Sequence, residues 1–136
     1  MGKVMAFGTF DLLHIGHLAY LEEARKLGDE LIVVVACDDS VRKEKGREPI
    51  IPQEQRRKMI ESLKPVSRAV IGYPGDRLKI IRELKPGVIA LGPDQKGDEK
   101  ELERKLGKGI KVIRVHKYEQ GWKTRSIIER IKNAGI

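Results

Sequence analysis

The sequence predicts an open α/β sheet of about five parallel strands with helices on both faces. Short β-rich apolar runs alternate with helical patterns along the whole chain, and such alternation is typical of parallel strands joined by crossover helices. The chain has 136 residues, a length that suits one compact unit. We therefore expect a single domain over residues 1–136.

Five runs of apolar and β-branched residues are the expected strands. Each has a typical strand length and is bounded by glycine, proline or charged residues. In chain order they are Lys3–Phe7, Leu31–Ala36, Arg68–Ile71, Val88–Leu91 and Ile110–Val115. Because one short helical segment joins the first two, we expect them to form a right-handed βαβ unit.

Helices are expected between the strands, where apolar residues recur at three- and four-residue spacing. The first is Ile15–Leu27, and we expect Gly28 to end it. Pro52 is expected to open the second, which extends to about residue 63 with Met59 and Ile60 on its inner face. Three more helices are expected over Asp76–Leu84, Asp98–Leu106 and Thr124–Lys132.

Three stretches are the least regular of the chain: Arg42–Pro52, Gly92–Gly97 and His116–Lys123. In an open parallel sheet, the loops carry the binding and catalytic residues. We therefore expect the functional site to be built largely from these segments.

The charge balance points to an anionic partner. Lys and Arg number 28 against 20 Asp and Glu, a formal net charge of +8, and such a surplus attracts phosphate groups. Aromatic residues make up only 4% of the chain, so the stacking platforms that bind single-stranded nucleic acid are scarce. A small polyphosphate needs the same sign of charge as a nucleic acid does.

Cysteine content and hydropathy exclude other classes of protein. The single cysteine, Cys37, excludes an intramolecular disulfide framework and a cysteine-rich zinc site. Apolar runs are too short for a membrane span, and the first residues resemble a strand more than a signal sequence. We expect a soluble cytoplasmic protein. One Asn and four Gln beside abundant Lys, Glu and Arg favour a thermophilic source.

The most specific motif lies between the first expected strand and the first expected helix, where the sequence from Gly8 to His17 is GTFDLLHIGH. At a spacing of three on an opening helical turn, the imidazoles of His14 and His17 can face one point. That point also receives free backbone N–H groups and the positive end of the helix dipole. Gly8 permits close approach, and Thr9 adds a hydroxyl donor. The segment therefore predicts a polyphosphate site.

Other interpretations of the motif stay open. Asp11, His14 and His17 could hold a divalent metal, although a fourth ligand at the expected spacing is missing. The two histidines could also serve only as packing residues at the helix start. Asp11 could cap the coming helical turn.

The string GTFDLLHIGH resembles the H-x-G-H signature of the nucleotidylyltransferase superfamily, and its GTFD opening resembles the cytidylyltransferase branch. Two further strings, Ile50–Arg56 and Leu91–Gln95, look most like the archaeal FAD synthetases of that branch. The resemblance covers nearly the whole chain. It implies a Rossmann-like domain that transfers AMP from ATP to FMN by direct attack of the FMN phosphate on the α-phosphorus, with release of pyrophosphate.

The resemblance also implies roles for individual residues. His14, His17 and Lys45 are the implied catalytic residues. The implied nucleotide-binding residues are Gly8, Thr9, Phe10, His14, His17, Gly92, Asp94, Thr124 and Arg125. Arg125 stands where the glycerol-phosphate relatives carry a second threonine, so its hydrogen bonding departs from the family pattern.

The implied acceptor-binding residues are Asp11, Arg47 and Trp122. Trp122 is the one tryptophan of the chain, and a flavin ring would stack on an aromatic partner. Plainer alternatives remain for all these segments: the run Arg42–Arg47 could be a solvated loop, Gly92–Gln95 a turn without ligand, and Trp122 a residue packed under the last helix.

The expected partners are ATP or CTP and FMN, with Mg²⁺ or another divalent cation on the triphosphate. A homodimer is expected from the family, and neither nucleic acid nor membrane is expected as a partner. The competing activities are a cytidylyltransferase acting on glycerol 3-phosphate or a similar phosphorylated alcohol, a phosphopantetheine adenylyltransferase, and a basic nucleotide- or RNA-binding protein. We expect the positive charge to surround one crevice, in Arg42–Arg47, Arg56–Lys58 and Lys123–Arg125.

Overall fold

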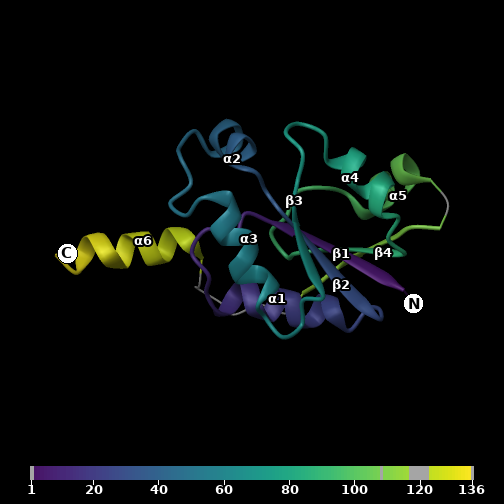
Figure 1. The fold of residues 1–136 in the computed structure, drawn as a ribbon, viewed down its shortest axis with the longest axis horizontal. Coiled ribbons are helices and arrows are strands. Elements are labelled where there is room, and N and C mark those ends of the chain that lie inside the picture. The colour runs from purple at the N-terminus through teal and green to yellow at the C-terminus, as the bar shows by residue number, and fades with distance from the viewer. Residues whose placement is uncertain (1, 108, 117–122, 136) are drawn as a thin grey trace.

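The computed structural model describes residues 2–107, 109–116 and 123–135. Its sheet is parallel throughout, with the strand order β3-β2-β1-β4-β5 (Figure 1). The strands are β1 (Lys3–Gly8), β2 (Glu30–Val35), β3 (Arg68–Ile71), β4 (Val88–Leu91) and β5 (Lys111–Arg114). The predicted open parallel sheet is confirmed: β3 and β4 have the predicted bounds, and no end of the other three strands differs by more than one residue.

Helices cover both faces of this sheet (Figure 1). They are α1 (Ile15–Arg25), α2 (Asp38–Lys45), α3 (Gln53–Glu61), α4 (Arg77–Leu84), α5 (Glu99–Leu106) and α6 (Thr124–Asn133). Helices α1 and α3 pack on one face, where Leu21 and Ile60 join a single apolar cluster. Helix α4 packs on the other face through Ile80 and Ile81.

The central strand β1 supplies both clusters by the alternation of its side chains. Val4 and Ala6 belong to the cluster under α1 and α3, whereas Met5 and Phe7 belong to the cluster under α4. Side chains alternate between the two faces of a strand, and every one of these four is buried. Strand β1 is therefore a fixed support for the loop that follows it.

Helix α2 was not predicted, because only Val41 of its residues is buried and no apolar stripe announces it. The sequence nevertheless contains residues that favour both ends of this helix. Asp38 and Asp39 lie in the first turn and basic residues in the last, which suits the helix dipole. Gly46 ends the helix in the left-handed region, with φ of 65°. The helix therefore replaces the start of the expected loop Arg42–Pro52.

Two smaller predictions are wrong. Helix α1 ends at a right-handed cap, Lys26, and Gly28 is not its terminator. A Cβ at Gly28 would lie 2.6 Å from the carbonyl oxygen of Gly2, so this glycine allows two backbone segments to approach closely. Met59 is 55% exposed and does not lie on the inner face of α3.

Helix α6 extends away from the body of the molecule (Figure 1). None of its residues is buried. Within the part of the chain that the structure describes, no helix has both the length and the apolar character needed to cross a bilayer.

Candidate active site

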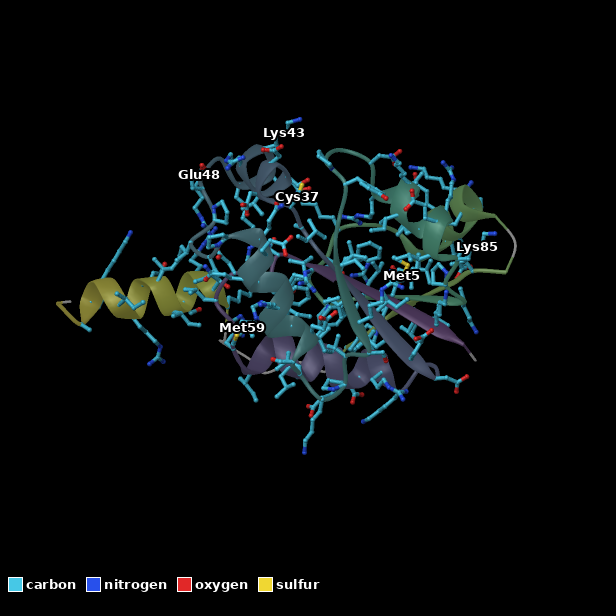
Figure 2. All side chains as sticks on the ribbon, in the orientation of Figure 1. Met5, Cys37, Lys43, Glu48, Met59 and Lys85 are labelled. Atoms are coloured by element: carbon cyan, nitrogen blue, oxygen red, sulfur yellow. The ribbon has the colours of Figure 1, made fainter. Side chains whose placement is uncertain are left out.

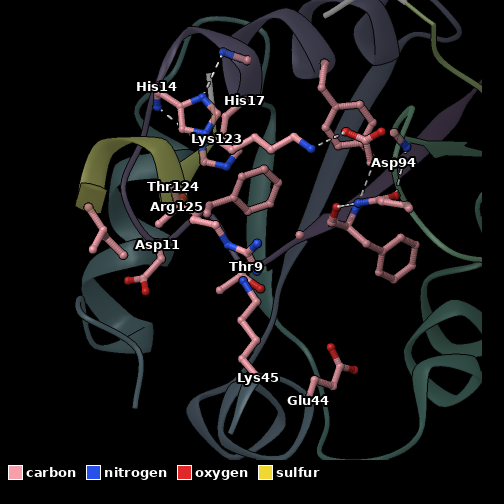
Figure 3. A pocket seen from close by; sticks show the side chains of 18 of the residues that line it. Thr9, Asp11, His14, His17, Glu44, Lys45, Asp94, Lys123, Thr124 and Arg125 are labelled. Carbon is pink, nitrogen blue, oxygen red and sulfur yellow. Dashed lines mark hydrogen bonds and ion pairs between the residues drawn. The ribbon is translucent and has the colours of Figure 1, made fainter. Parts of the chain in front are cut away.

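An open cavity of about 1150 Å³ lies at the carboxyl ends of β1 and β4 (Figure 3). Within the sheet, β1 lies between β2 and β4. The chain passes from β1 to β2 on one side of β1, and β4, which comes later in the chain, lies on the opposite side of β1. Ligands of open α/β sheets bind at such a switch point, outside the carboxyl ends of the strands.

The structure brings together twelve of the thirteen predicted site residues around this cavity. The segment after β1 contributes Gly8, Thr9, Phe10, Asp11, His14 and His17. The other segments contribute Lys45, Arg47, Gly92, Asp94, Thr124 and Arg125. Trp122, the thirteenth, lies outside the described residues.

His14 and His17 cap helix α1 and hold each other in place. His14 is the N-cap residue, and its Nδ1 accepts a hydrogen bond of 3.1 Å from the amide of Gly16. The Nδ1 of His17 accepts one of 3.3 Å from the amide of His14. The rings stack with their centroids 3.8 Å apart. Because both Nδ1 atoms are acceptors, each neutral ring carries its proton on Nε2 and can donate it to a ligand.

The surroundings keep both imidazoles neutral. Burial, followed by the charges of His14 and Lys45, lowers the pKa of His17 to about 3. Burial likewise lowers the pKa of His14 below its ordinary value. At neutral pH the pair therefore offers two uncharged N–H donors.

Asp11 is a buried anchor for the segment before α3. Its Oδ1 accepts from the amide of Ile51 at 2.8 Å, and its Oδ2 accepts from Ile50 at 2.9 Å and from Arg47 Nη1 at 3.4 Å. Burial acts to raise the pKa of Asp11, but the two amides and the guanidinium lower it below its ordinary value. The capping alternative is wrong, because His14 caps α1; the acceptor-binding role of Asp11 stays a prediction.

Arg56 is buried and is not one of the positive charges around the cavity. Only 1% of its surface is exposed. It donates to the carbonyl oxygens of Thr9 and Ala36 at 2.8 Å and of Ile51 at 2.7 Å, and it pairs with Asp38 at 2.7 Å. One side chain therefore joins the loop after β1, the end of β2 and the starts of α2 and α3.

Only part of the predicted positive charge faces the cavity. Among the described residues, Lys45, Arg47 and the segment Lys123–Arg125 line it, but Arg56–Lys58 do not. Arg42 is paired with Asp39 and Glu48 on the surface, and Lys43 points away from the body of the molecule (Figure 2). Burial and Arg47 lower the pKa of Lys45.

The turn after β4 is fixed from behind by Arg114, which the sequence analysis did not single out. Its Nη1 donates to the carbonyl oxygens of Gly92 at 2.9 Å and Gln95 at 2.8 Å, and its Nη2 donates to Gly97 at 2.7 Å. Asp94 of this turn faces Lys123 across the cavity, with 3.7 Å between Oδ2 and Nζ (Figure 3).

The alternative of a metal held by the motif does not match the geometry. Both oxygens of Asp11 are engaged by backbone amides, and both Nδ1 atoms of the histidine pair accept hydrogen bonds. Among the described residues, no group of three or more His, Cys, Asp and Glu side chains is placed to hold a metal ion.

Sequence reasoning also gave no individual role to Tyr20 and Gln95, which line the cavity. The signal for Tyr20 is a hydroxyl on the otherwise aliphatic inner face of α1, since a buried tyrosine needs a hydrogen-bond partner. No comparable signal marks Gln95.

Comparison with known families agrees with the site. A family model described as cytidylyltransferase-like matches residues 5–131. The chain belongs to the cytidylyltransferase-like family, as the motif GTFDLLHIGH predicted.

Several archaeal relatives named FAD synthase match most of the chain. The protein of Aciduliprofundum boonei is 54% identical in an alignment of 121 positions that covers 87% of this chain and 80% of that protein. The protein of Pyrococcus horikoshii is 48% identical in an alignment of 136 positions that covers 95% of this chain and 91% of that protein. The resemblance to the archaeal FAD synthetases is confirmed.

A solved structure has the same fold. It is a crystal structure described as the lipopolysaccharide core biosynthesis protein from Thermoplasma volcanium, with a TM-score of 0.83 and 48% identity. The match covers 88% of this chain and 99% of that one.

Proposed function

We propose that this chain is an FMN adenylyltransferase, which transfers AMP from ATP to FMN and forms FAD and pyrophosphate. The relatives named FAD synthase, at 44–54% identity, support this activity. The observation that carries the proposal is the stacked, neutral pair His14 and His17, which presents Nε2–H groups into a cavity at the strand ends.

The reaction needs no nucleophile from the protein. A phosphate oxygen of FMN attacks the α-phosphorus of ATP, a new P–O bond forms, and the bond from the α-phosphorus to the bridging oxygen breaks as pyrophosphate leaves. The protein contributes position and stabilisation of charge on the transferring group. His14 and His17 donate to the α- and β-phosphate oxygens, where one such donor is worth about 3–4 kcal/mol.

The other lining residues complete the proposed site. Lys45, Thr124 and Arg125 contact the triphosphate. Arg47 contacts the phosphate of FMN, since a guanidinium group can donate two hydrogen bonds to one phosphate. Asp11 orients the acceptor through Arg47, its ion-pair partner. The backbone of Gly8, Thr9 and Phe10, together with Gly92 and Asp94, holds the adenosine. Trp122 stacks on the flavin.

Mg²⁺ is proposed to enter with ATP. Since no cluster of acidic and histidine side chains among the described residues is placed to hold it, phosphate oxygens would supply most of its ligands. The ion would neutralise charge on the triphosphate.

We also propose a homodimer. Large apolar side chains remain exposed near the carboxyl end of the chain and elsewhere, among them Ile131 at 46%, Ile50 at 49% and Met59 at 55%. A second copy that covers them would remove apolar surface from water. Light scattering during size-exclusion chromatography should give about twice the 15.4 kDa mass of the chain; a monomer mass at all concentrations would contradict the dimer.

One assay tests the proposed activity. The purified protein is incubated with ATP or CTP, Mg²⁺ and one acceptor, which is FMN, glycerol 3-phosphate or phosphopantetheine. Nucleotide products are separated by chromatography, and pyrophosphate is measured in parallel. We expect FAD from ATP and FMN. A product from CTP and glycerol 3-phosphate without any FAD would refute the proposal and favour a cytidylyltransferase.

A further inference from the structure

Strands β1 and β4 separate at the place where the cavity begins. The pairing of β1 with β2 continues to Gly8 and Val35, but the pairing of β1 with β4 ends at Ala6 and Ala90. Phe7 and Gly8 at the end of β1 and Gly92 after β4 line the cavity, so the distance between the two strand ends affects the width of the cavity. Two side chains that line the cavity occupy this place, Tyr20 and Gln95.

The hydroxyl of Tyr20 bridges the two strands just beyond their last pair. Tyr20 projects from α1 and is buried. Its oxygen accepts a hydrogen bond of 3.2 Å from the amide of Phe7 on β1 and donates one of 2.6 Å to the carbonyl oxygen of Ala90 on β4. The phenol therefore stands between backbone groups of both strands.

The carboxamide of Gln95 occupies the next step of the ladder. In the same register Phe7 would pair with Leu91, and the carbonyl of Phe7 would accept from the amide of Gly92. Instead, Gln95 Nε2 donates to the carbonyl of Phe7, and Gln95 Oε1 accepts from the amide of Gly92 at 2.9 Å. The carboxamide of Gln95, with its two hydrogen bonds, therefore replaces one direct backbone hydrogen bond between Phe7 and Gly92. The ends of β1 and β4 lie farther apart than they would in a continuous ladder.

The turn that carries Gln95 cannot move inwards freely, because Arg114 holds it from the other side. The guanidinium binds the carbonyls of Gly92 and Gln95. The side chain of Gln95 is thus held across the opening from β4 to β1. Two groups, a phenol from α1 and a carboxamide from the turn, keep the same pair of strands apart, and their side chains also hydrogen-bond to each other.

We propose that Tyr20 and Gln95 are positioning residues that set the width of the part of the cavity receiving the adenosine of ATP. This inference rests on the proposed function. The opening lies between Gly8 and Gly92, both of which line the cavity. Neither side chain is required to touch the reacting atoms; each acts through the backbone of β1 and β4.

Two substitutions remove the spacers with little change of shape. Tyr20→Phe deletes only the hydroxyl, and the freed groups of Phe7 and Ala90 can then bond directly and draw the strands together. Gln95→Met keeps the length of the side chain but neither donates nor accepts at its end. We expect each variant to weaken ATP binding about tenfold, because small displacements of a binding site have large effects. The KM for FMN and kcat at saturating ATP should change less than about twofold, since these rest on other groups.

The experiment measures ATP binding to each variant by calorimetry without FMN, followed by steady-state kinetics and thermal unfolding. Tyr73→Phe is the matched control, because its hydroxyl binds Glu83 on the surface and it does not line the cavity among the described residues. It should bind ATP as the unaltered protein does. In the double variant the two losses should combine to less than their product, because both act on one separation.

The outcomes separate the inference from the proposed activity. If the unaltered protein makes no FAD, the proposed function fails, while the calorimetric comparison still tests the spacers. If both variants bind ATP like the unaltered protein, or lose affinity for ATP and FMN equally along with thermal stability, the inference is refuted. Gln95→Met decides alone if Tyr20→Phe does not fold.

Discussion

The two walls of the cavity are built differently. The wall after β1 rests on buried groups with complete hydrogen bonding: Asp11 binds two backbone amides, and Arg56 binds three carbonyls and Asp38. The wall from α6 has no buried residue. It meets the rest of the site through a bond of 3.5 Å from the Thr124 hydroxyl to the carbonyl of Leu12 and the exposed pair of Lys123 and Asp94.

This difference between the two walls indicates which groups of the site must be positioned accurately. Groups that stabilise a transition state must be held within a fraction of an ångström by their surroundings, and the histidine pair stands on the buried wall. Arg125 and Lys132 of α6 line the cavity, and such long cationic side chains can contact an anionic ligand from an exposed position. Predictions about the two walls should therefore differ in size.

The largest expected effect is on the stability of the buried wall. Arg56→Met leaves three carbonyls and Asp38 without their donor, which should lower the free energy of unfolding by about 3–5 kcal/mol. Urea denaturation followed by circular dichroism measures it. The neighbouring Arg57→Met is the matched control, because it breaks only surface pairs with Glu54 and Glu61 and should cost less than about 1 kcal/mol. Equal losses for the two variants would contradict the contrast.

The next effect is on catalysis. His14→Ala removes one Nε2–H donor and should lower kcat about 10²–10³-fold, while ATP affinity changes much less. Initial rates of FAD formation and calorimetric titration with ATP give the two numbers. His116→Ala is the control, since the third histidine is exposed and outside the cavity lining among the described residues. Equal losses of rate and affinity for His14→Ala would show that the donor acts only in binding.

The effect expected from acid is smaller for each pH unit. The folded pKa of His17, about 3, lies below its ordinary value of 6.5, so between these values the unfolded chain binds the extra proton. The stabilisation is complete above pH 6.5 and is lost as the pH falls towards 3, with a slope of at most about 1.4 kcal/mol per pH unit. Denaturation at several pH values should show a shallower slope for His17→Gln. An unchanged slope would mean that another group carries the acid sensitivity.

The smallest effect belongs to the exposed wall. Lys123→Ala breaks a surface pair with Asp94, and both side chains are more than half exposed. ATP affinity should fall by less than about fivefold, and added salt should reduce the difference, because exposed charges are screened. Lys43→Ala, on the outer side of α2, should have no effect on ATP affinity. If Lys123→Ala lowered ATP affinity by as large a factor as His14→Ala lowers kcat, the expected difference between the two walls would be contradicted.

Local pattern was enough to predict the sheet and the position of the histidine pair. The alternation of strands and helices, and two histidines at a strand-to-helix junction, are both readable over a few residues. Helix α2 was missed because it buries only Val41. Arg56 was wrongly expected among the charges around the crevice, although Ile60, one helical turn later, marks the same buried face.

The remaining contacts join residues far apart in the chain. Arg56 and Thr9 are 47 residues apart, Tyr20 and Ala90 are 70 apart, and Gln95 and Phe7 are 88 apart. No local periodicity carries such partnerships, because they arise only when the strands have taken their order in the sheet. The width of the cavity and the rigidity of its buried wall could therefore not be predicted from the sequence.

Because His14 and His17 are both oriented by the backbone of one turn, the pair could be transferred to another protein together with that turn. Each ring is oriented by a backbone amide within the same four residues, and no distant side chain is needed to choose the proton-bearing nitrogen. A protein engineer could move this turn to another strand-to-helix junction and keep the direction of both N–H groups. What would not travel with it is the buried support beneath, and a graft of this kind would measure how much of the catalytic power belongs to four residues alone.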